Sequence, residues 1–176
     1  FSPVREPRAL RVALSFATPF GVSDRVDPQI RAAVERIGRR LEELGHEVIE
    51  LDPDYGLVGP ALVPRGNAAV HRWLERVGDR SWLEPRTRVA AQIGRALSGW
   101  PLSLSRRAEP ALRRRIGRVF DRADVVLTPT TAKLPPRVRA LAGRSWWETA
   151  NAVSAMCPFT FAWNVTGWPA ISVPAG

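Results

Sequence analysis

The side chains best suited to chemistry in this sequence are one cysteine and two histidines. The thiol of Cys157 could act as a nucleophile, but the sequence places no histidine beside it to accept its proton. A lone cysteine more often serves as a small apolar residue of the interior, and we interpret Cys157 in this way. His46 and His71 have no Cys, Asp or second His at the spacing of metal ligands, so we predict no metal site.

Motifs for other common chemistries are missing from the sequence. No GxxxxGK or GxGxxG motif follows a predicted strand to hold a phosphate or a dinucleotide, and we expect no cofactor. No GxSxG motif offers a serine nucleophile on a turn between a strand and a helix. These residues alone describe an α/β protein without a catalytic apparatus.

The positive charge of the chain comes almost entirely from arginine. Lys and Arg number 26 against 17 Asp and Glu, the net charge is +9, and Lys133 is the only lysine. Such a charge is typical of nucleic-acid binding. However, arginine together with abundant Ala, Gly and Pro is also what a GC-rich genome encodes, so we do not expect a nucleic acid as partner. One basic helix face, which we interpret as a solvated surface, carries Arg107, Arg114, Arg118 and Arg122.

The cysteine count and the absence of long apolar runs bear on the compartment. A single cysteine excludes an internal disulfide and is compatible with a reducing compartment. No apolar run approaches the roughly 18 residues that cross a bilayer, and no leader opens the sequence. We expect a cytoplasmic protein and leave open whether it forms a homo-oligomer. Because Phe1 is not a start residue and the sequence stops after an apolar stretch, we expect both ends to be cut.

The start of the chain predicts a strand, a helix and a second strand. The strands are LRVALSF (10–16), which alternates and carries β-favouring side chains, and HEVIELD (46–52). Between them, apolar residues recur at helical spacing over 27–44. Asp27 suits the N-cap of this helix, and Gly45 suits the left-handed conformation that ends it. This order is typical of a βαβ unit with parallel strands.

The middle of the chain is predicted to be helical. The clearest helical patterns cover 68–78 and 87–100. We expect Glu109 and Pro110 to open a further helix, because proline suits a first helical turn. We interpret the region of about 61–123 as a helical insertion in the domain.

The last part of the chain predicts two strands separated by a helix. DVVLTPT (124–130) predicts a short buried strand. Ser145, with Glu148 three residues later, predicts a capping box at a helix start. We predict a turn at 164–167 and a final strand at 168–175.

Two of these segments resemble the amidase signature family. DVVLTPT resembles the family's Asp-x-Leu-Leu-Thr-Pro-Thr strand, and PFTFAWNVTGWPAISVPAG resembles its Pro-Phe-Thr and Asn-x-Thr-Gly-x-Pro-Ala-x-Ser-Val-Pro-x-Gly strings. The strand and helix near the start also look like those that follow the family's catalytic region. The resemblance is weakest between residues 55 and 120. It implies an α/β fold with a mixed β-sheet flanked by helices, of which residues 1–176 are a single partial domain.

The resemblance also implies an activity, which this chain does not carry by itself. Family members hydrolyse a small-molecule amide to a carboxylate and ammonia or an amine through a serine acyl-enzyme. Their two catalytic serines and lysine lie in the N-terminal half, in a Gly/Ser-rich stretch. This sequence has no adjacent serines, and Lys133 does not match the catalytic lysine. We therefore assign no catalytic residue and expect the chain alone to be inactive.

The resemblance further implies which residues line the acyl side of the substrate pocket. Counted from the anchors Asn164 and Gly167, the pocket-facing positions are Ser154, Cys157 and Phe161. Their spacing of three and then four residues would put them on one helical face. An alternative is that this stripe only packs the core. Glutaminyl-specific members carry an acid at the position of Cys157. A small apolar Cys157, with Phe161 one turn on, argues for an uncharged or apolar acyl group and against a tRNA-amidotransferase subunit.

Two other functions stay open from the sequence. One is a non-catalytic scaffold or degenerate member of the same family, which the coding sequence upstream of Phe1 would distinguish. The other is an arginine-rich module associated with nucleic acid. Such a module would bind duplex DNA with an affinity that collapses between roughly 50 and 200 mM salt.

Overall fold

A three-stranded parallel sheet forms one end of the molecule. The computed structural model describes residues 8–19 and 26–175. Strands β1 (Arg11–Leu14), β2 (Glu47–Glu50) and β3 (Val125–Leu127) lie in the order β2-β1-β3. The central position of β1 buries Val12 and Ala13 completely. The α/β class is thus confirmed. All strands within the described ranges are parallel, so these ranges contain no antiparallel member of the predicted mixed sheet.

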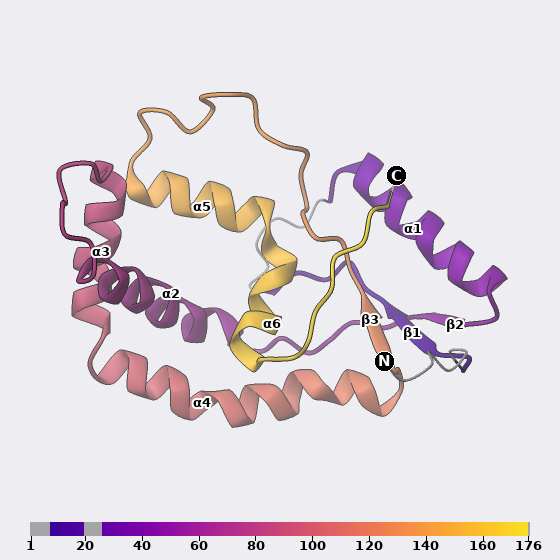
Figure 1. Cartoon of the computed structure of the whole chain (residues 1–176). Helices are drawn as coiled ribbons and strands as arrows, with labels where there is room; N and C mark the ends of the chain where they lie inside the picture. The colour runs from indigo at the N-terminus through magenta and orange to yellow at the C-terminus, as the bar shows by residue number, and fades with distance from the viewer. Residues whose placement is uncertain (1–7, 20–25, 176) are drawn as a thin grey trace, which may run out of the picture.

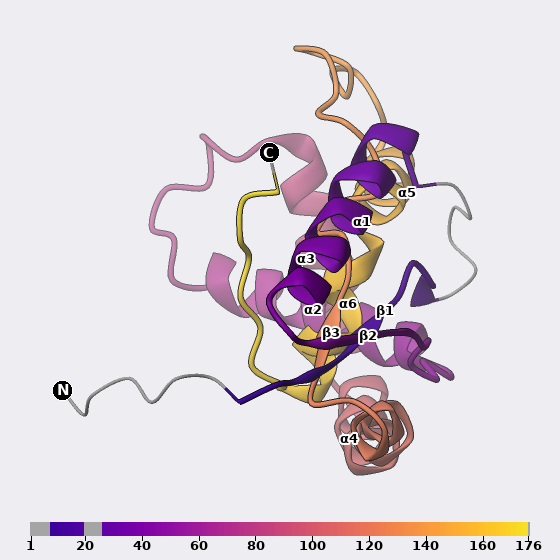
Figure 2. The ribbon, with the colours of Figure 1, turned by 90° about the vertical axis from the view of Figure 1, so that its right-hand side faces the viewer.

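Helix α1 (Pro28–Glu43) connects β1 to β2 and packs against one face of the sheet (Figures 1 and 2). The Asp27 carboxylate accepts a hydrogen bond from the Gln29 amide, which satisfies one of the free donors at the helix start. Gly45 has a φ of 86° directly after the helix, a conformation that costs glycine little. The predicted strand, capped helix and strand are therefore confirmed, because their signals are local.

Three long helices follow on the other side of the sheet (Figure 1). They are α2 (Val58–Leu74), α3 (Pro85–Leu97) and α4 (Trp100–Gly117), and a 3-10 turn (Arg118–Asp121) leads from α4 to β3. A shared core cluster joins α2 and α4 to a later helix and consists of Tyr55, Val58, Ala61, Leu112, Ile116, Ala162 and Val165. Within residues 8–19 and 26–175, no helix has the length and apolar character to cross a membrane.

The prediction that Glu109 and Pro110 open a helix is wrong. Helix α4 begins at Trp100, and Pro110 lies in its interior. Proline there removes one backbone hydrogen bond. The helix nevertheless continues because Leu102, Ser105 and Leu112 lie at helical spacing and are all buried. Tertiary packing of this stripe thus outweighs the local cost of the proline.

Helix α5 (Trp146–Met156) begins where the sequence predicts. The Ser145 hydroxyl accepts from the Glu148 amide at 3.2 Å, and the Glu148 carboxylate accepts from the Ser145 amide at 2.8 Å. The capping box is therefore confirmed. The Ser145 hydroxyl also donates to the Glu148 carboxylate at 2.7 Å. This bond, with the one from the Ser145 amide, holds the pKa of Glu148 below its ordinary value.

The chain after α5 differs from the prediction in two places. Residues 164–166 are not a turn but the end of helix α6 (Phe161–Thr166), which Gly167 closes with a φ of 66°. Residues 168–175 are not a strand. A strand needs a neighbouring backbone, and this tail has no ladder partner among the described residues. Within residues 8–19 and 26–175, a side-chain hydrogen bond joins Ser172 of the tail to Thr130, while Ile171 is 89% exposed.

The contact between α2 and α3 gives a test of this packing. A Cβ at Gly94 in α3 would overlap the backbone carbonyl of Asn67 in α2. We expect Gly94→Ala to lower the free energy of unfolding by about 1–3 kcal/mol, because backbone cannot move aside as a side chain can. Gly66→Ala is the matched control, since nothing lies within 4 Å of a Cβ there. This control should stabilise α2 by up to about 1 kcal/mol. Urea denaturation measures the free energy of unfolding of both variants. Equal changes in the two variants would contradict the close approach of α2 and α3.

Candidate functional site

Polar residues gather where the parallel strands end, which is where ligands bind in open α/β sheets. Ser15 follows β1, and Asp52 follows β2 after one residue. The buried Ser15 hydroxyl donates to the Asp52 carboxylate at 2.7 Å and accepts from the Ala17 amide at 3.2 Å. Thr130 lies beyond the end of β3. This group was not predicted from the sequence, although a polar residue shortly after each strand was the available signal.

Tyr55 adds a buried hydroxyl close to these strand ends. The residue is 7% exposed, and its hydroxyl has no hydrogen-bond partner among the described residues. Burial, reinforced by the negative charge of Asp52, raises the pKa of Tyr55 far above its ordinary value. The phenol therefore stays neutral at all physiological pH values. Its ring meets Trp163 of α6 edge-on at 6.5 Å, which ties the strand ends to the later helix.

The predicted pocket residues lie on three different pieces of backbone. Ser154 belongs to α5, Cys157 lies in the bend after it, and Phe161 begins α6. Pro158 lacks an amide donor and disfavours the helical region for the residue before it. Cys157 accordingly has a φ of −123° and a ψ of 52°. The prediction that the three share one helical face is wrong. All three are half-buried, and their role as a pocket wall stays a prediction.

Ala132 holds the bend at Cys157 next to the end of the sheet. Its amide donates to the carbonyl of Met156 at 2.8 Å, and its carbonyl accepts from the amide of Asp27 at 2.8 Å. One residue thus joins the end of α5 to the start of α1 and to the segment that leaves β3. The backbone around Cys157 is therefore fixed beside the carboxyl ends of the strands, where a substrate pocket is expected.

Arg65 of α2 positions α6 from the opposite side. Its guanidinium donates to the Val165 carbonyl at 3.4 Å and to the Ser105 hydroxyl at 2.9 Å. It also forms a salt bridge with Glu109 at 2.8 Å. Carbonyls in the last turn of a helix lack partners inside the helix, and a cation there is favourable. Arg65 therefore fixes α6 against both α2 and α4.

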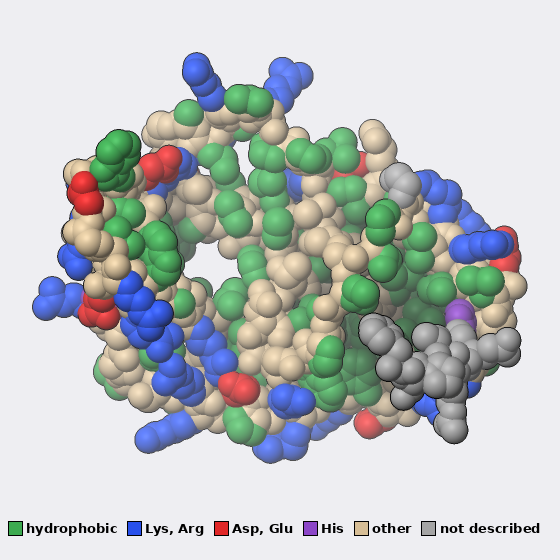
Figure 3. Space-filling model, viewed as in Figure 1, with side chains coloured by type: hydrophobic (Ala, Val, Ile, Leu, Met, Phe, Trp, Pro, Cys, Tyr) green, Lys and Arg blue, Asp and Glu red, His purple; other side chains and the backbone are tan. Residues whose placement is uncertain are grey.

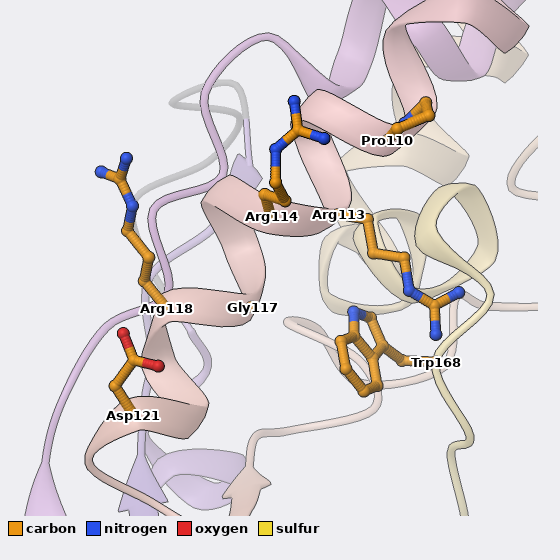
Figure 4. Close-up of a pocket in the computed structure, with 7 residues that line it drawn as sticks. All are labelled: Pro110, Arg113, Arg114, Gly117, Arg118, Asp121 and Trp168. Carbon is orange, nitrogen blue, oxygen red and sulfur yellow. The ribbon is translucent and has the colours of Figure 1, made fainter.

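Trp168 and the basic end of α4 border a cavity of about 530 Å³ (Figure 4). The indole packs on Phe120 at 4.8 Å between ring centroids, and the Arg113 guanidinium lies 4.6 Å from its ring. A Cβ at Gly117 would lie 3.4 Å from the indole, so the small residue leaves room for it. Trp168 thus fills space between α4 and the end of α6. Its indole nitrogen is buried without a partner in the described part of the chain.

Both histidines contact other side chains or backbone of the chain. His46 accepts a hydrogen bond from the Leu10 amide at 3.1 Å. The ring nitrogen Nε2 of His71 in α2 lies 3.6 Å from the carboxylate of Glu75, which follows the helix. No group of three or more His, Cys, Asp or Glu side chains is placed to hold a metal ion among residues 8–19 and 26–175.

Comparison with known proteins identifies the family. The Amidase family model matches residues 2–176. The chain belongs to the amidase family. Two similar proteins of Mycobacterium tuberculosis are "Putative amidase AmiA2", 44% identical over 172 residues, and "Putative amidase AmiB2", 37% identical over 171 residues. Each alignment covers 97% of this chain but only 36% and 37% of the relative, so this amidase chain spans just over a third of their length.

Solved structures agree with this family at the level of the fold. The 6-aminohexanoate cyclic dimer hydrolase superposes with a TM-score of 0.73 and 20% identity, over 93% of this chain and 37% of that protein. A bacterial aryl acylamidase of the amidase signature family superposes with a TM-score of 0.66 and 20% identity, over 96% of this chain and 37% of that protein. The α/β arrangement of this amidase chain is therefore that of amidase signature enzymes.

The Arg65 contacts give a test of how α6 is held in this amidase chain. We expect Arg65→Ala to lower the free energy of unfolding by about 2 kcal/mol, because charge-assisted hydrogen bonds to α4 and α6 are lost together. Arg72→Ala is the control, since Arg72 is exposed on the same helix and forms no salt bridge within the described ranges. The control should stay within about 0.5 kcal/mol of wild type. Urea denaturation followed by tryptophan fluorescence measures both, and equal stabilities would rule out this role for Arg65.

Proposed function

We propose that this chain forms one wall of the substrate pocket of an amidase whose nucleophile lies elsewhere in a longer polypeptide. The observation that carries the proposal is the family match over residues 2–176 in a chain without adjacent serines and with one lysine. The whole enzyme would attack a small-molecule carboxamide with serine, form an acyl-enzyme, and release ammonia or an amine. The chain alone would supply the wall and part of the sheet, but no chemistry.

The wall itself would consist of Ser154, Cys157 and Phe161. Two contacts support this placement, since Ala132 fixes the bend at Cys157 beside the strand ends and Arg65 fixes the helix that Phe161 begins. None of the three residues is acidic or basic, so the pocket would accept an uncharged or apolar acyl group.

The setting of the whole enzyme is part of the proposal. We place it in the cytoplasm, consistent with its single cysteine. Helices α2 to α4 would be the helical insertion of about 61–123. The basic face would be a solvated surface rather than a nucleic-acid site. The side chains of Arg107, Arg114, Arg118 and Arg122 are all exposed, as such a surface requires.

Activity of the isolated chain tests the missing nucleophile. We expect the chain alone to hydrolyse aryl and aliphatic amides at the buffer rate and to resist labelling by a fluorophosphonate probe. Loss of a serine nucleophile costs on the order of 10⁶ in turnover. The matched protein is a chimaera in which this chain replaces the aligned segment of AmiA2, and it should be labelled. A serine labelled in the isolated chain would overturn the proposal, and a folded chimaera without labelling would favour the scaffold alternative.

A charge placed in the pocket tests the wall. In the chimaera, we expect Cys157→Asp to favour amides with an ammonium group on the acyl side over neutral amides. The ratio of their kcat/KM values should shift by about tenfold, because opposite charges in a pocket discriminate between ligands. Gln92→Glu adds the same charge at an exposed position of α3 and should leave the ratio unchanged. An unchanged ratio in Cys157→Asp would mean that Cys157 does not line the substrate pocket.

A further inference from the structure

Helix α5 is apolar but buries none of its residues. It carries two Trp, three Ala, a Val and a Met among its 11 residues, and no one of them is buried. Trp147 is 64% exposed and Val153 is 43% exposed. A helix of this composition normally packs an apolar stripe against a neighbour. Helix α5 therefore leaves part of its apolar surface, at Trp147 and Val153, uncovered in the described part of the chain.

The space beside α5 is open. In Figure 3, an opening passes through the molecule between α5 and α2, which Figure 1 shows in the same view. The helix is held near its two ends. Arg86 of α3 donates to the Leu141 carbonyl and to the Thr149 hydroxyl, and the Met156 carbonyl accepts from Ala132. The middle of α5 thus borders a gap that the other helices do not fill.

A cavity extends the open apolar surface at the start of α5. It measures about 420 Å³ and lies between Trp146 and Trp147 of α5 and Pro85 and Val89 of α3. The two indoles lie 6.1 Å apart between ring centroids. Trp147 is exposed and Trp146 is half-buried, and aromatic side chains such as these are enriched in protein interfaces.

We propose that the apolar surface of α5 is the docking surface for the remaining polypeptide of the same amidase, which inserts apolar side chains into the opening. The identity of this partner rests on the proposed function. The relatives align with 97% of this chain, yet nearly two thirds of their length lies outside the aligned segment. This is enough polypeptide to cover a helix about 16 Å long.

Two other occupants fit the surface less well. A second copy would bring together two chains that each carry a net charge of +9, and like charges oppose association. A small amide would leave most of the helix uncovered, because α5 spans three turns. The remaining polypeptide is the occupant that matches both the extent and the apolar character of the surface.

Thiol labelling tests the docking surface without relying on activity. The variant Val153→Cys, made in a Cys157→Ser background, is compared in the isolated chain and in the AmiA2 chimaera by peptide mass spectrometry. We expect the thiol at position 153 to react about tenfold more slowly in the chimaera, because docking buries it. Arg39→Cys in the same background is the control on an exposed position of α1, and it should react equally in both.

The outcomes separate the docking surface from the proposed activity. Equal reactivity at position 153 in both proteins would overturn the docking proposal, even if the chimaera with Cys157 intact is labelled by a fluorophosphonate. Protection at position 153 without fluorophosphonate labelling would support docking and contradict the proposed function. A chimaera that does not fold counts against docking, because a surface built for this partner should accept it. If light scattering shows that the isolated chain is a dimer and Val153→Asp makes it a monomer, the occupant is a second copy.

Discussion

The guanidinium of Arg65 is the contact on which the arrangement of the helices depends. It reaches α4 through Ser105 and Glu109, and α6 through the carbonyl of Val165. These bonds surround the apolar cluster of α2, α4 and α6, so the polar network and the core impose the same geometry. A planar guanidinium with five donors can satisfy several acceptors at fixed angles, which a lysine could not do. Ser105 shows how tight the junction is, because its hydroxyl is buried and also donates to the carbonyl of Ala61.

The sheet imposes a second constraint from the opposite side. Parallel strands place their carboxyl ends on one edge, and the chain leaving each strand has to turn there. Ser15, Asp52 and Ala132 fix these turns by hydrogen bonds between segments far apart in the sequence. The bend at Cys157 is thus held by Ala132, while the helix after it is held by Arg65. The candidate pocket wall therefore lies between two independently fixed supports, which favours a rigid surface.

The elements whose signals are local were predicted correctly from the sequence. Predictions were wrong where contacts with distant segments determine the structure. The cap at Asp27, the glycine at 45 and the box of Ser145 and Glu148 each act within a few residues, and all are confirmed. Helix α4 continues through Pro110 because its apolar stripe packs on α2, which the local pattern does not contain. Arg65 and Val165 are 100 residues apart, so nothing in the sequence joins them. The pocket residues were inferred from the family resemblance. The prediction that they share one helical face is wrong because the helix ends before Pro158.

The separation of the wall from the nucleophile determines how this chain would affect catalysis. A side chain that touches only the non-reacting part of a substrate contributes binding that is similar in the ground state and the transition state. Such changes alter KM and the choice between substrates more than the chemical step. Cys157 and Phe161 would act in this way under the proposed function, since that function places both against the acyl group and not at the reacting bond. Arg65 would act one step further away, because it positions the helix that carries Phe161. Weakening the contacts of Arg65 would therefore loosen the acyl site more than it would disturb the nucleophile. Discrimination between amides would fall by more than turnover.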